Sequence, residues 1–223
     1  TLGIPSFRLE KDVIEAEIDV LRQMGVQFQT GVEVGKDVTL DDLRKQGYRA
    51  FYVAIGAQGG RKVGVEGEDA DGVISGIEFL RGVNAGASAE LSGKTVVIGG
   101  GNVAVDVART AVRAGSESVD MYCLESRDIM PASEEEIEEA EGEGIAVHTC
   151  FGPKRILSEN GKVTGVEFKR CLRVFDENGR FAPAYDENDT VTVEADHVLV
   201  TIGQSILWGD LLAESGAQFN RNG

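Results

Sequence analysis

A glycine-rich turn between a short apolar strand and an amphipathic helix limits the possible folds of this chain more than any other segment. Residues 95–98 are β-branched and apolar, and three glycines follow at 99–101. Residues 102–114 place small apolar side chains at helical spacing, and residues 119–124 predict the next strand. A strand, helix and strand within about 30 residues form a βαβ unit, whose two strands are parallel. We therefore expect an α/β fold with a Rossmann-like parallel sheet.

The turn itself has the pattern G-x-G-x-x-A, formed by Gly99, Gly101 and Ala104. The first glycine permits a tight turn, the second lets the backbone approach a pyrophosphate, and the small third residue lets the helix pack closely on the strand. The helix N-terminus adds unpaired N–H groups and the positive end of its dipole. The alternative is a glycine turn that only packs. We predict dinucleotide binding by this segment, through Gly99, Gly100, Gly101, Asn102, Val103 and Ala104.

An acidic residue follows the second strand of this unit. Glu125 stands at the strand end, where a carboxylate can accept hydrogen bonds from an adenosine ribose and repel a 2′-phosphate. This position favours NADH over NADPH. Arg127 argues for the opposite preference, because it could pair with that phosphate. Glu125 could also be an exposed turn carboxylate with no role in binding.

The remaining pattern predicts helices and a change of strand direction. We expect helices at 10–24, 39–43, 76–83 and 133–143, and further strands at 26–28, 49–55, 145–150, 154–158, 162–175, 190–193 and 198–202. Thr39 suits a helix N-cap, and Ser133 with Glu136 has the spacing of a capping box. Asn-Gly pairs at 160–161 and 178–179 favour tight reversals. They predict an antiparallel β-meander against the parallel sheet.

Charge and composition exclude several classes of function. The net charge of −16 argues against nucleic-acid binding, which needs a basic face. The acidic run at 134–143 is interpreted as a solvated helix face or as a docking surface for a basic partner. No apolar run reaches membrane-spanning length and no signal peptide is visible, so we expect a cytoplasmic protein without a membrane partner.

Catalytic and metal-binding side chains are not predicted. Cys123, Cys150 and Cys171 lack CxxC spacing, so we expect buried reduced thiols and neither a disulfide framework nor a metal site. No Ser/His/Asp or Cys/His arrangement is evident. Hydride transfer does not need such groups, because the cofactors carry the chemistry and the protein orients them.

Three blocks of sequence resemble one enzyme family. The run at residues 3–9 (GIPSFRL), the fingerprint at 97–111 (VIGGGNVAVDVARTA) and the block at 126–132 (SRDIMPA) resemble the glutamate synthase small-subunit family. Dihydropyrimidine dehydrogenase and NADH-dependent ferredoxin oxidoreductases are among its relatives. The resemblance implies an enzyme in which NAD(P)H delivers hydride to FAD. Electrons would then pass to iron–sulfur clusters or to a partner subunit or domain.

The same resemblance implies a domain division. Residues 1–61 would be part of a second, Rossmann-like FAD domain, residues 62–203 would form the inserted NAD(P)-binding domain, and residues 204–223 would return to the FAD domain. Strand ends at Ile55-Gly56 and Ile202-Gly203 resemble the family's crossings between domains, which makes Gly203 a candidate cofactor-site residue. The family's first glycine fingerprint and its last Gly-Asp block are expected outside this segment. FAD would therefore bind only in the full-length parent.

The sequence departs from the family at one informative place. Many members carry two arginines where Leu124 and Glu125 stand, and those members are expected to favour NADPH. Two other interpretations of the whole chain remain open at this stage. One is a non-catalytic module that senses NAD(H) and regulates a partner, and the other is a structural subunit whose glycines only pack.

Overall fold

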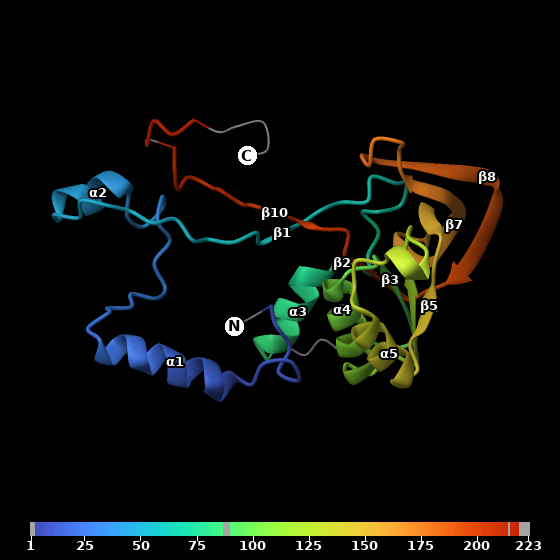
Figure 1. The fold of residues 1–223 in the computed structure, drawn as a ribbon, viewed down its shortest axis with the longest axis horizontal. Coiled ribbons are helices and arrows are strands. Elements are labelled where there is room, and N and C mark those ends of the chain that lie inside the picture. Colours follow the sequence, from blue (N-terminus) through green and yellow to red (C-terminus); the bar gives the residue numbers. More distant parts are fainter. Residues whose placement is uncertain (1–2, 87–89, 214, 219–223) are drawn as a thin grey trace. The chain divides into compact units, whose positions relative to one another are not determined.

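The computed structural model describes residues 3–86, 90–213 and 215–218 of the 223-residue chain (Figure 1). Its contacts divide the chain into two units. Unit 1 contains Gly60–Gly203 together with the N-terminal residues up to Glu10, and unit 2 contains Lys11–Gly59 and the residues from Gln204 onward. This differs from the division expected from sequence, which grouped the residues before Lys11 with the segment up to residue 61.

Unit 1 is built on a five-stranded parallel sheet. Its order is β2 (Val73–Ser75), β9 (His197–Val200), β3 (Lys94–Ile98), β4 (Ser118–Tyr122) and β5 (Ala146–His148). Every neighbouring pair is parallel, so the strands end at one common edge. The predicted βαβ unit is confirmed, because β3, α4 and β4 follow in that order.

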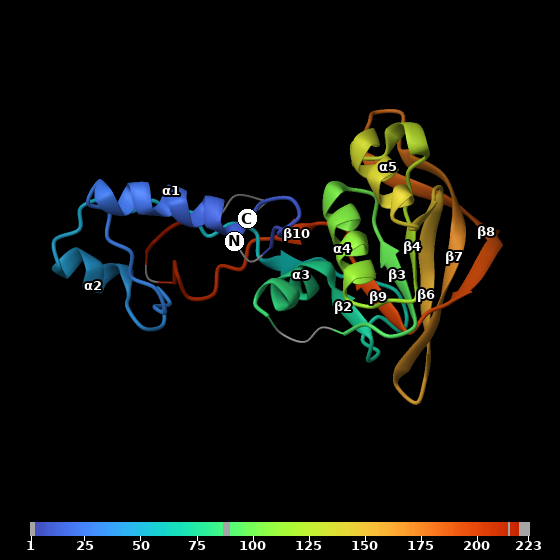
Figure 2. The same ribbon diagram turned by 90° about the horizontal axis from the view of Figure 1, so that it is seen from below.

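Three helices cover one face of this sheet (Figure 2). They are α3 (Gly76–Asn84), α4 (Asn102–Arg113) and α5 (Glu134–Gly142). Side chains alternate between the two faces of a strand. Val97 accordingly packs in the core beneath the helices, while Val96 and Ile98 pack in the core on the opposite face.

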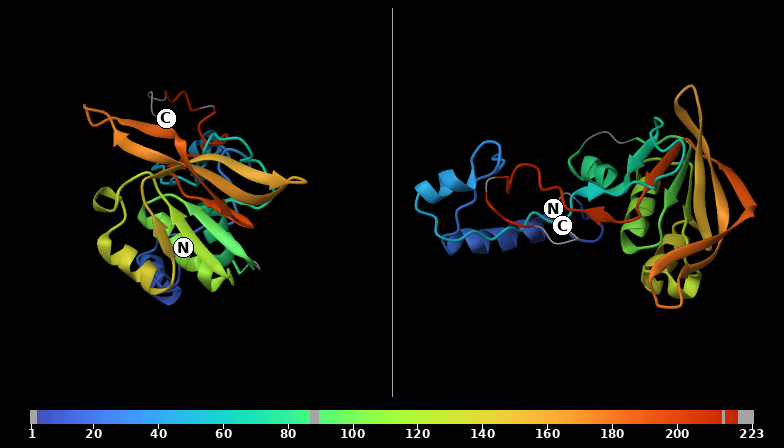
Figure 3. Two further views of the ribbon diagram at one scale, coloured as in Figure 1. Left: turned by 90° about the vertical axis from the view of Figure 1, so that its right-hand side faces the viewer. Right: turned by 90° about the horizontal axis from the view of Figure 1, so that it is seen from above.

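An antiparallel sheet covers that opposite face (Figure 3). It consists of β6 (Phe151–Glu159), β7 (Lys162–Phe175) and β8 (Phe181–Glu194), in that order. Asn160 and Gly161 have φ of 52° and 81°, the left-handed conformation that a type I′ turn requires. The predicted combination of a parallel sheet with an antiparallel meander is confirmed.

Unit 2 contains helices α1 (Lys11–Gln23) and α2 (Leu40–Lys45). Thr39 caps α2 as predicted, and Asp42 completes a capping box with it. The strands predicted at 26–28 and 49–55 do not form. A strand is stable only beside partner strands, and within the described residues of unit 2 these segments have none. The short strands β1 (Gly59–Gly60) and β10 (Gln204–Ser205) pair with each other.

Candidate functional site

The candidate site lies where β3, β4 and β9 end together. Gly99 follows β3 with φ of 144°, and its N–H donates to the Tyr122 carbonyl at 2.9 Å. A Cβ at Gly99 would overlap the backbone and hydroxyl of Thr201, which follows β9. The Thr201 hydroxyl donates in turn to the Ile98 carbonyl at 2.8 Å. Gly99 therefore makes the tight turn that its position in the motif predicts.

The other small residues of the turn occupy different surroundings. A Cβ at Gly100 would lie 2.8 Å from the Cys123 Cβ, so this position is closed by the protein itself. A Cβ at Gly101 would meet nothing within 4 Å. Gly101 is the N-cap of α4, and no side chain caps that helix start. Ala104 is fully buried, so α4 packs tightly there. The turn thus leaves open backbone at the helix N-terminus, where a phosphate would be bound.

Glu125 lies beside this turn and is half-buried. A Cβ on Gly100 would be 3.2 Å from the Glu125 Oε2 atom, which places the carboxylate against the glycine segment. The Glu125 carbonyl accepts a hydrogen bond of 2.9 Å from the N–H of Cys150, which precedes β6. This contact fixes the backbone of Glu125 at the edge of the sheet.

Arg127 is held by α5. Its guanidinium pairs with Glu134 at 2.8 Å and with Glu141 at 2.7 Å. These two carboxylates raise the pKa of Arg127. The Arg127 side chain is thus already engaged with carboxylates of α5.

Two hydrogen bonds join the glycine turn to the segment that leads into α5. The Ala132 N–H donates to the Gly100 carbonyl at 3.0 Å, and the Ser133 N–H donates to the Asn102 Oδ1 atom at 3.1 Å. Asn102 thus uses its side chain to connect the first residue of α4 with the N-cap of α5. The Ser133 side chain makes no capping hydrogen bond, so the predicted capping box is wrong. Its intended partner, Glu136, pairs with Arg8 instead.

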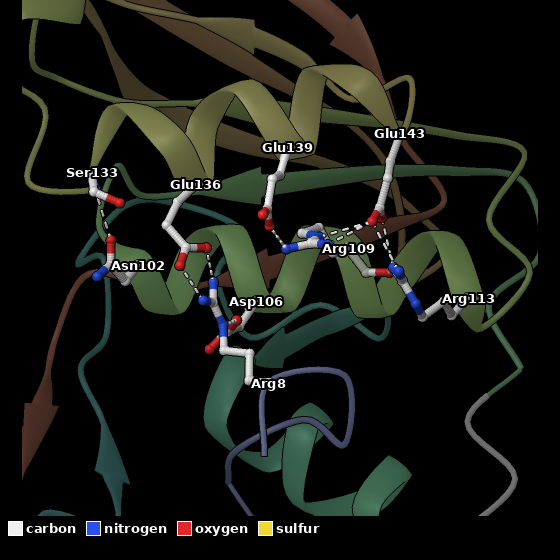
Figure 4. Close-up of polar contacts among 9 residues, drawn as sticks. All are labelled: Arg8, Asn102, Asp106, Arg109, Arg113, Ser133, Glu136, Glu139 and Glu143. Atoms are coloured by element: carbon white, nitrogen blue, oxygen red, sulfur yellow. Dashed lines mark hydrogen bonds and ion pairs between the residues drawn. The ribbon is translucent and has the colours of Figure 1, made fainter. Parts of the chain in front are cut away.

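A seam of charged side chains runs between α4 and α5 (Figure 4). Arg109 pairs with Glu139 and Glu143, and Arg113 also pairs with Glu143. The hydrogen bond from Arg113, together with Arg109, lowers the pKa of Glu143 to about 2. Five carboxylates of the acidic run 134–143 are engaged in this way with arginines of the same chain: Glu134, Glu136, Glu139, Glu141 and Glu143. Glu134, Glu139 and Glu141 remain exposed, so the run is a solvated helix face whose carboxylates are also paired with arginines.

The seam was not predicted from the sequence, although the spacing of the charged residues contains a signal for it. Three charged residues of α4 and three glutamates of α5 and its C-cap share the same spacing, with intervals of three and then four residues: Asp106, Arg109 and Arg113, and Glu136, Glu139 and Glu143. Residues at these intervals lie on one face of a helix. Two such faces of mostly opposite charge predict a pair of neighbouring helices. Arg8 had no comparable signal, because it precedes the first helix.

The remaining predicted residues lie at or near the same edge. Val103 is half-buried in the first turn of α4. Gly203 has φ of 114°, and its carbonyl accepts the Arg61 N–H at 3.1 Å.

Cys123 and Cys171 are buried, and burial raises the pKa of the Cys123 thiol to about 12. Among the residues that the structure describes, no group of three or more His, Cys, Asp or Glu side chains could hold a metal ion.

Comparison with known proteins gives consistent matches. The sequence profile of the pyridine nucleotide-disulphide oxidoreductase family matches residues 22–223. The chain is 37% identical over 211 residues to the NADP(+)-dependent formate dehydrogenase subunit beta of Moorella thermoacetica, covering 92% of this chain and 29% of that protein. It is 34% identical over 216 residues to the glutamate synthase [NADPH] small chain of Escherichia coli (strain K12), covering 91% of this chain and 46% of the relative. The resemblance noted in the sequence is confirmed.

A third curated relative and a solved structure extend the comparison. The NADPH-Fe(3+) oxidoreductase subunit beta of Geobacter sulfurreducens (strain DL-1 / KN400) is 37% identical, covering 91% of this chain and 31% of that protein. The chain thus spans less than half the length of these curated relatives. The structure of Mycobacterium tuberculosis FprA in complex with NADPH aligns with a TM-score of 0.77 at 21% identity, covering 90% of this chain and 60% of FprA. This similarity shows the fold.

Within the part of the chain that the structure describes, no helix is both long and apolar enough to cross a membrane.

Proposed function

Since this chain belongs to the pyridine nucleotide-disulphide oxidoreductase family, we propose that residues 62–203 bind a nicotinamide dinucleotide and present it to FAD held by other parts of a longer polypeptide. Residues 1–61 and 204–223 are then parts of the FAD domain. The bound nucleotide supplies the hydride, and the chain supplies the site that orients it. No side chain of this chain is assigned a catalytic role.

The observation that carries the proposal is the geometry of the glycine turn. Open backbone at Gly101 meets the N-terminus of α4 at the carboxyl edge of a parallel sheet. Ligands of open α/β sheets bind at this edge, and anions bind at such helix starts. A dinucleotide would place its pyrophosphate against residues 99–104. We assign Glu125 to the adenosine ribose, and Gly203 to the edge of the site beyond β9.

NADH is proposed as the better ligand, although the relatives named above are NADP- or NADPH-dependent by name. Glu125 can accept a hydrogen bond from a ribose 2′-hydroxyl and would repel a 2′-phosphate. Arg127 could relieve that repulsion, but it already pairs with Glu134 and Glu141. Binding of NADPH would therefore leave the repulsion by Glu125 in place, or Arg127 would relieve it only by exchanging ion pairs that it already makes.

Flavin is expected in the parent protein and not in this chain alone. Among the described residues, a glycine turn between a parallel strand and a helix N-terminus occurs at residues 99–104, and this turn is assigned to the nicotinamide nucleotide. The pyrophosphate of FAD would then need a further glycine turn, which we expect from other parts of the parent. In the parent, we propose that electrons leave FAD toward iron–sulfur clusters or a partner subunit, since relatives are subunits of larger enzymes by name.

Isothermal titration of the 223-residue chain with NADH and with NADPH tests the proposal. We expect binding of both nucleotides at one site, with the lower dissociation constant for NADH. Absence of any nicotinamide nucleotide binding would leave the glycines with a packing role only. In the complete parent, NADH should bleach the flavin absorbance; binding without bleaching would indicate a regulatory module instead.

A further inference from the structure

The N-terminal segment of residues 5–9, here called the strap, is bound to the helices of unit 1. Pro5 is buried, and its carbonyl accepts the N–H groups of Arg8 at 3.0 Å and Leu9 at 3.2 Å. This tight turn presents the side chains of Phe7 and Arg8 to α4 and α5. The strap is the stretch that the sequence grouped with the flavin domain, yet its contacts are with the helices that begin beside the glycine turn.

Arg8 contacts both helices at once (Figure 4). Its Nε atom donates to Asp106 on α4, and its two terminal nitrogens donate to the two carboxylate oxygens of Glu136 on α5. The side chain of Arg8 is 23% exposed, and those of Asp106 and Glu136 are 14% and 18% exposed. A planar guanidinium that satisfies two carboxylates on different helices fixes the distance between them.

Phe7 extends the same contact along α4. Its ring lies beneath the guanidinium groups of Arg109 and Arg113, with distances of 4.7 and 4.4 Å to the ring centroid. Both arginines also pair with Glu143, the residue that follows α5. The strap therefore joins the charged seam as an additional layer that touches both helices.

The two residues that Arg8 contacts each lie one helical turn after a helix start that borders the glycine turn. Asp106 lies one helical turn after Asn102, and Glu136 lies one turn after Ser133. Asn102 and Ser133 are themselves joined by the hydrogen bond of 3.1 Å between the two helix starts. Arg8 therefore holds the first turns of α4 and α5 together, one turn behind the backbone that would meet the pyrophosphate.

We propose that Arg8 is a positioning residue for nucleotide binding. It acts through Asp106 and Glu136, keeping the N-terminus of α4 and residues 125–133 at the spacing that a dinucleotide requires, and it does not touch the nucleotide. This inference rests on the proposed function of residues 99–104. Without Arg8, the bridge that joins Asp106 on α4 to Glu136 on α5 is lost, and the two helix starts lose the contact that sets their spacing.

Dissociation constants for NADH test this inference on the 223-residue chain, at a temperature where every variant is fully folded. Arg8→Met should bind about fivefold to tenfold more weakly, the size of effect seen when a coupled contact is lost. The matched control is Arg22→Met, because Arg22 also bridges two carboxylates, Glu15 and Asp19, but lies in unit 2. That control should bind like the wild type.

A double variant separates positioning from simple electrostatics. Arg8→Met removes a positive charge, which alone would weaken binding of an anionic nucleotide. Adding Glu136→Gln restores the net charge of this cluster, so an electrostatic effect would disappear while a positioning effect would persist. We expect the double variant to remain weak. Hydrogen exchange should also become faster in residues 132–137 of Arg8→Met, and stay unchanged in β3.

The outcomes are distinct. Wild-type affinity in Arg8→Met, or recovery of affinity in the double variant, would overturn the positioning role while leaving the proposed function intact. If the wild type binds neither NADH nor NADPH, the proposed function fails and the role of Arg8 fails with it.

Discussion

At the scale of single residues, the glycines of the turn have different physical tasks. Gly99 needs a φ that side chains rarely adopt, Gly100 is packed against Cys123, and Gly101 faces open space with φ of −95°. Substitution at Gly99 or Gly100 should therefore disturb the protein itself. Substitution at Gly101 should disturb only what approaches it from outside.

Gly101→Val should abolish nucleotide binding, because its side chain would occupy the space that the pyrophosphate approaches. The melting temperature should change little, because extended backbone accepts a β-branched residue and a Cβ built at Gly101 meets no neighbouring atom within 4 Å. Gly99→Ala is the matched contrast and should lower the melting temperature, since its Cβ would overlap Thr201. Calorimetric titration and thermal unfolding of both variants measure the two effects. Unchanged affinity in Gly101→Val would remove residues 99–104 from the site.

Replacing Glu125 by Arg should narrow or reverse a preference for NADH. The carboxylate can contribute roughly 1.5–3 kcal/mol through a charge-assisted hydrogen bond to the ribose. Each 1.4 kcal/mol or so recovered for NADPH changes the ratio of dissociation constants by about tenfold. Dissociation constants for NADH and for NADPH, measured on the wild type and on the variant, test this prediction. If the wild type already binds NADPH as tightly as NADH, Glu125 is not the selector and Arg127 becomes the better candidate.

At the scale of elements, the pairing of α4 with α5 depends on charge. Apolar side chains such as Val107 and Ile137 are buried beneath the two helices, but their outer sides meet through arginines and glutamates. Glu143 shows this dependence on charge most directly, because Arg113 and Arg109 lower the pKa of its carboxyl group from 4.5 to about 2. Because the folded-state pKa is below the unfolded value, its contribution to stability is present above about pH 4.5 and is lost as the pH falls toward 2.

Glu143→Gln should therefore lower the stability of the folded chain at pH 7 by about 1–3 kcal/mol. The difference from wild type should shrink between about pH 4.5 and pH 2. Melting temperatures of both proteins across this range provide the measurement. The exposed Glu135 is a suitable control for substitution by Gln, because it lies on the same helix and no described ion pair involves it. A gap between Glu143→Gln and wild type that is constant with pH would contradict this account.

At the scale of the whole molecule, the two units differ in how much they bury. Unit 1 contains two apolar cores, one on each face of its parallel sheet. None of the described residues of unit 2 is buried, and residues such as Met24 and Tyr52 are largely exposed. Residues 50–55 and 207–211 also line an open groove of about 770 Å³. Unit 2 by itself therefore lacks the apolar burial that offsets the entropy cost of ordering a chain.

Limited proteolysis of the 223-residue chain should therefore cut first within residues 11–59 and leave residues 60–203 protected. Local opening requires little free energy where few apolar contacts must break. Mass spectrometry of the first fragments identifies the sites.

The same preparation should be colourless, because half an FAD site gives little affinity. Early cleavage inside the parallel sheet, or a stoichiometric flavin absorbance, would contradict the proposed division of roles.

Elements whose signals lie within a few residues could be predicted from the amino-acid sequence. The alternation of strands and helices, the glycine turn and the Asn160-Gly161 reversal all depend on backbone preferences within a few residues, and the structure forms them as predicted. The segments at 26–28 and 49–55 did not form the expected strands, because a strand also depends on partner strands distant in sequence. For the same reason, only the tertiary structure brought Arg8 to Asp106 and Glu136, which follow it by 98 and 128 residues. Charge pairing across such separations is set by how the helices pack on the sheet, and no local pattern near Arg8 contains that information.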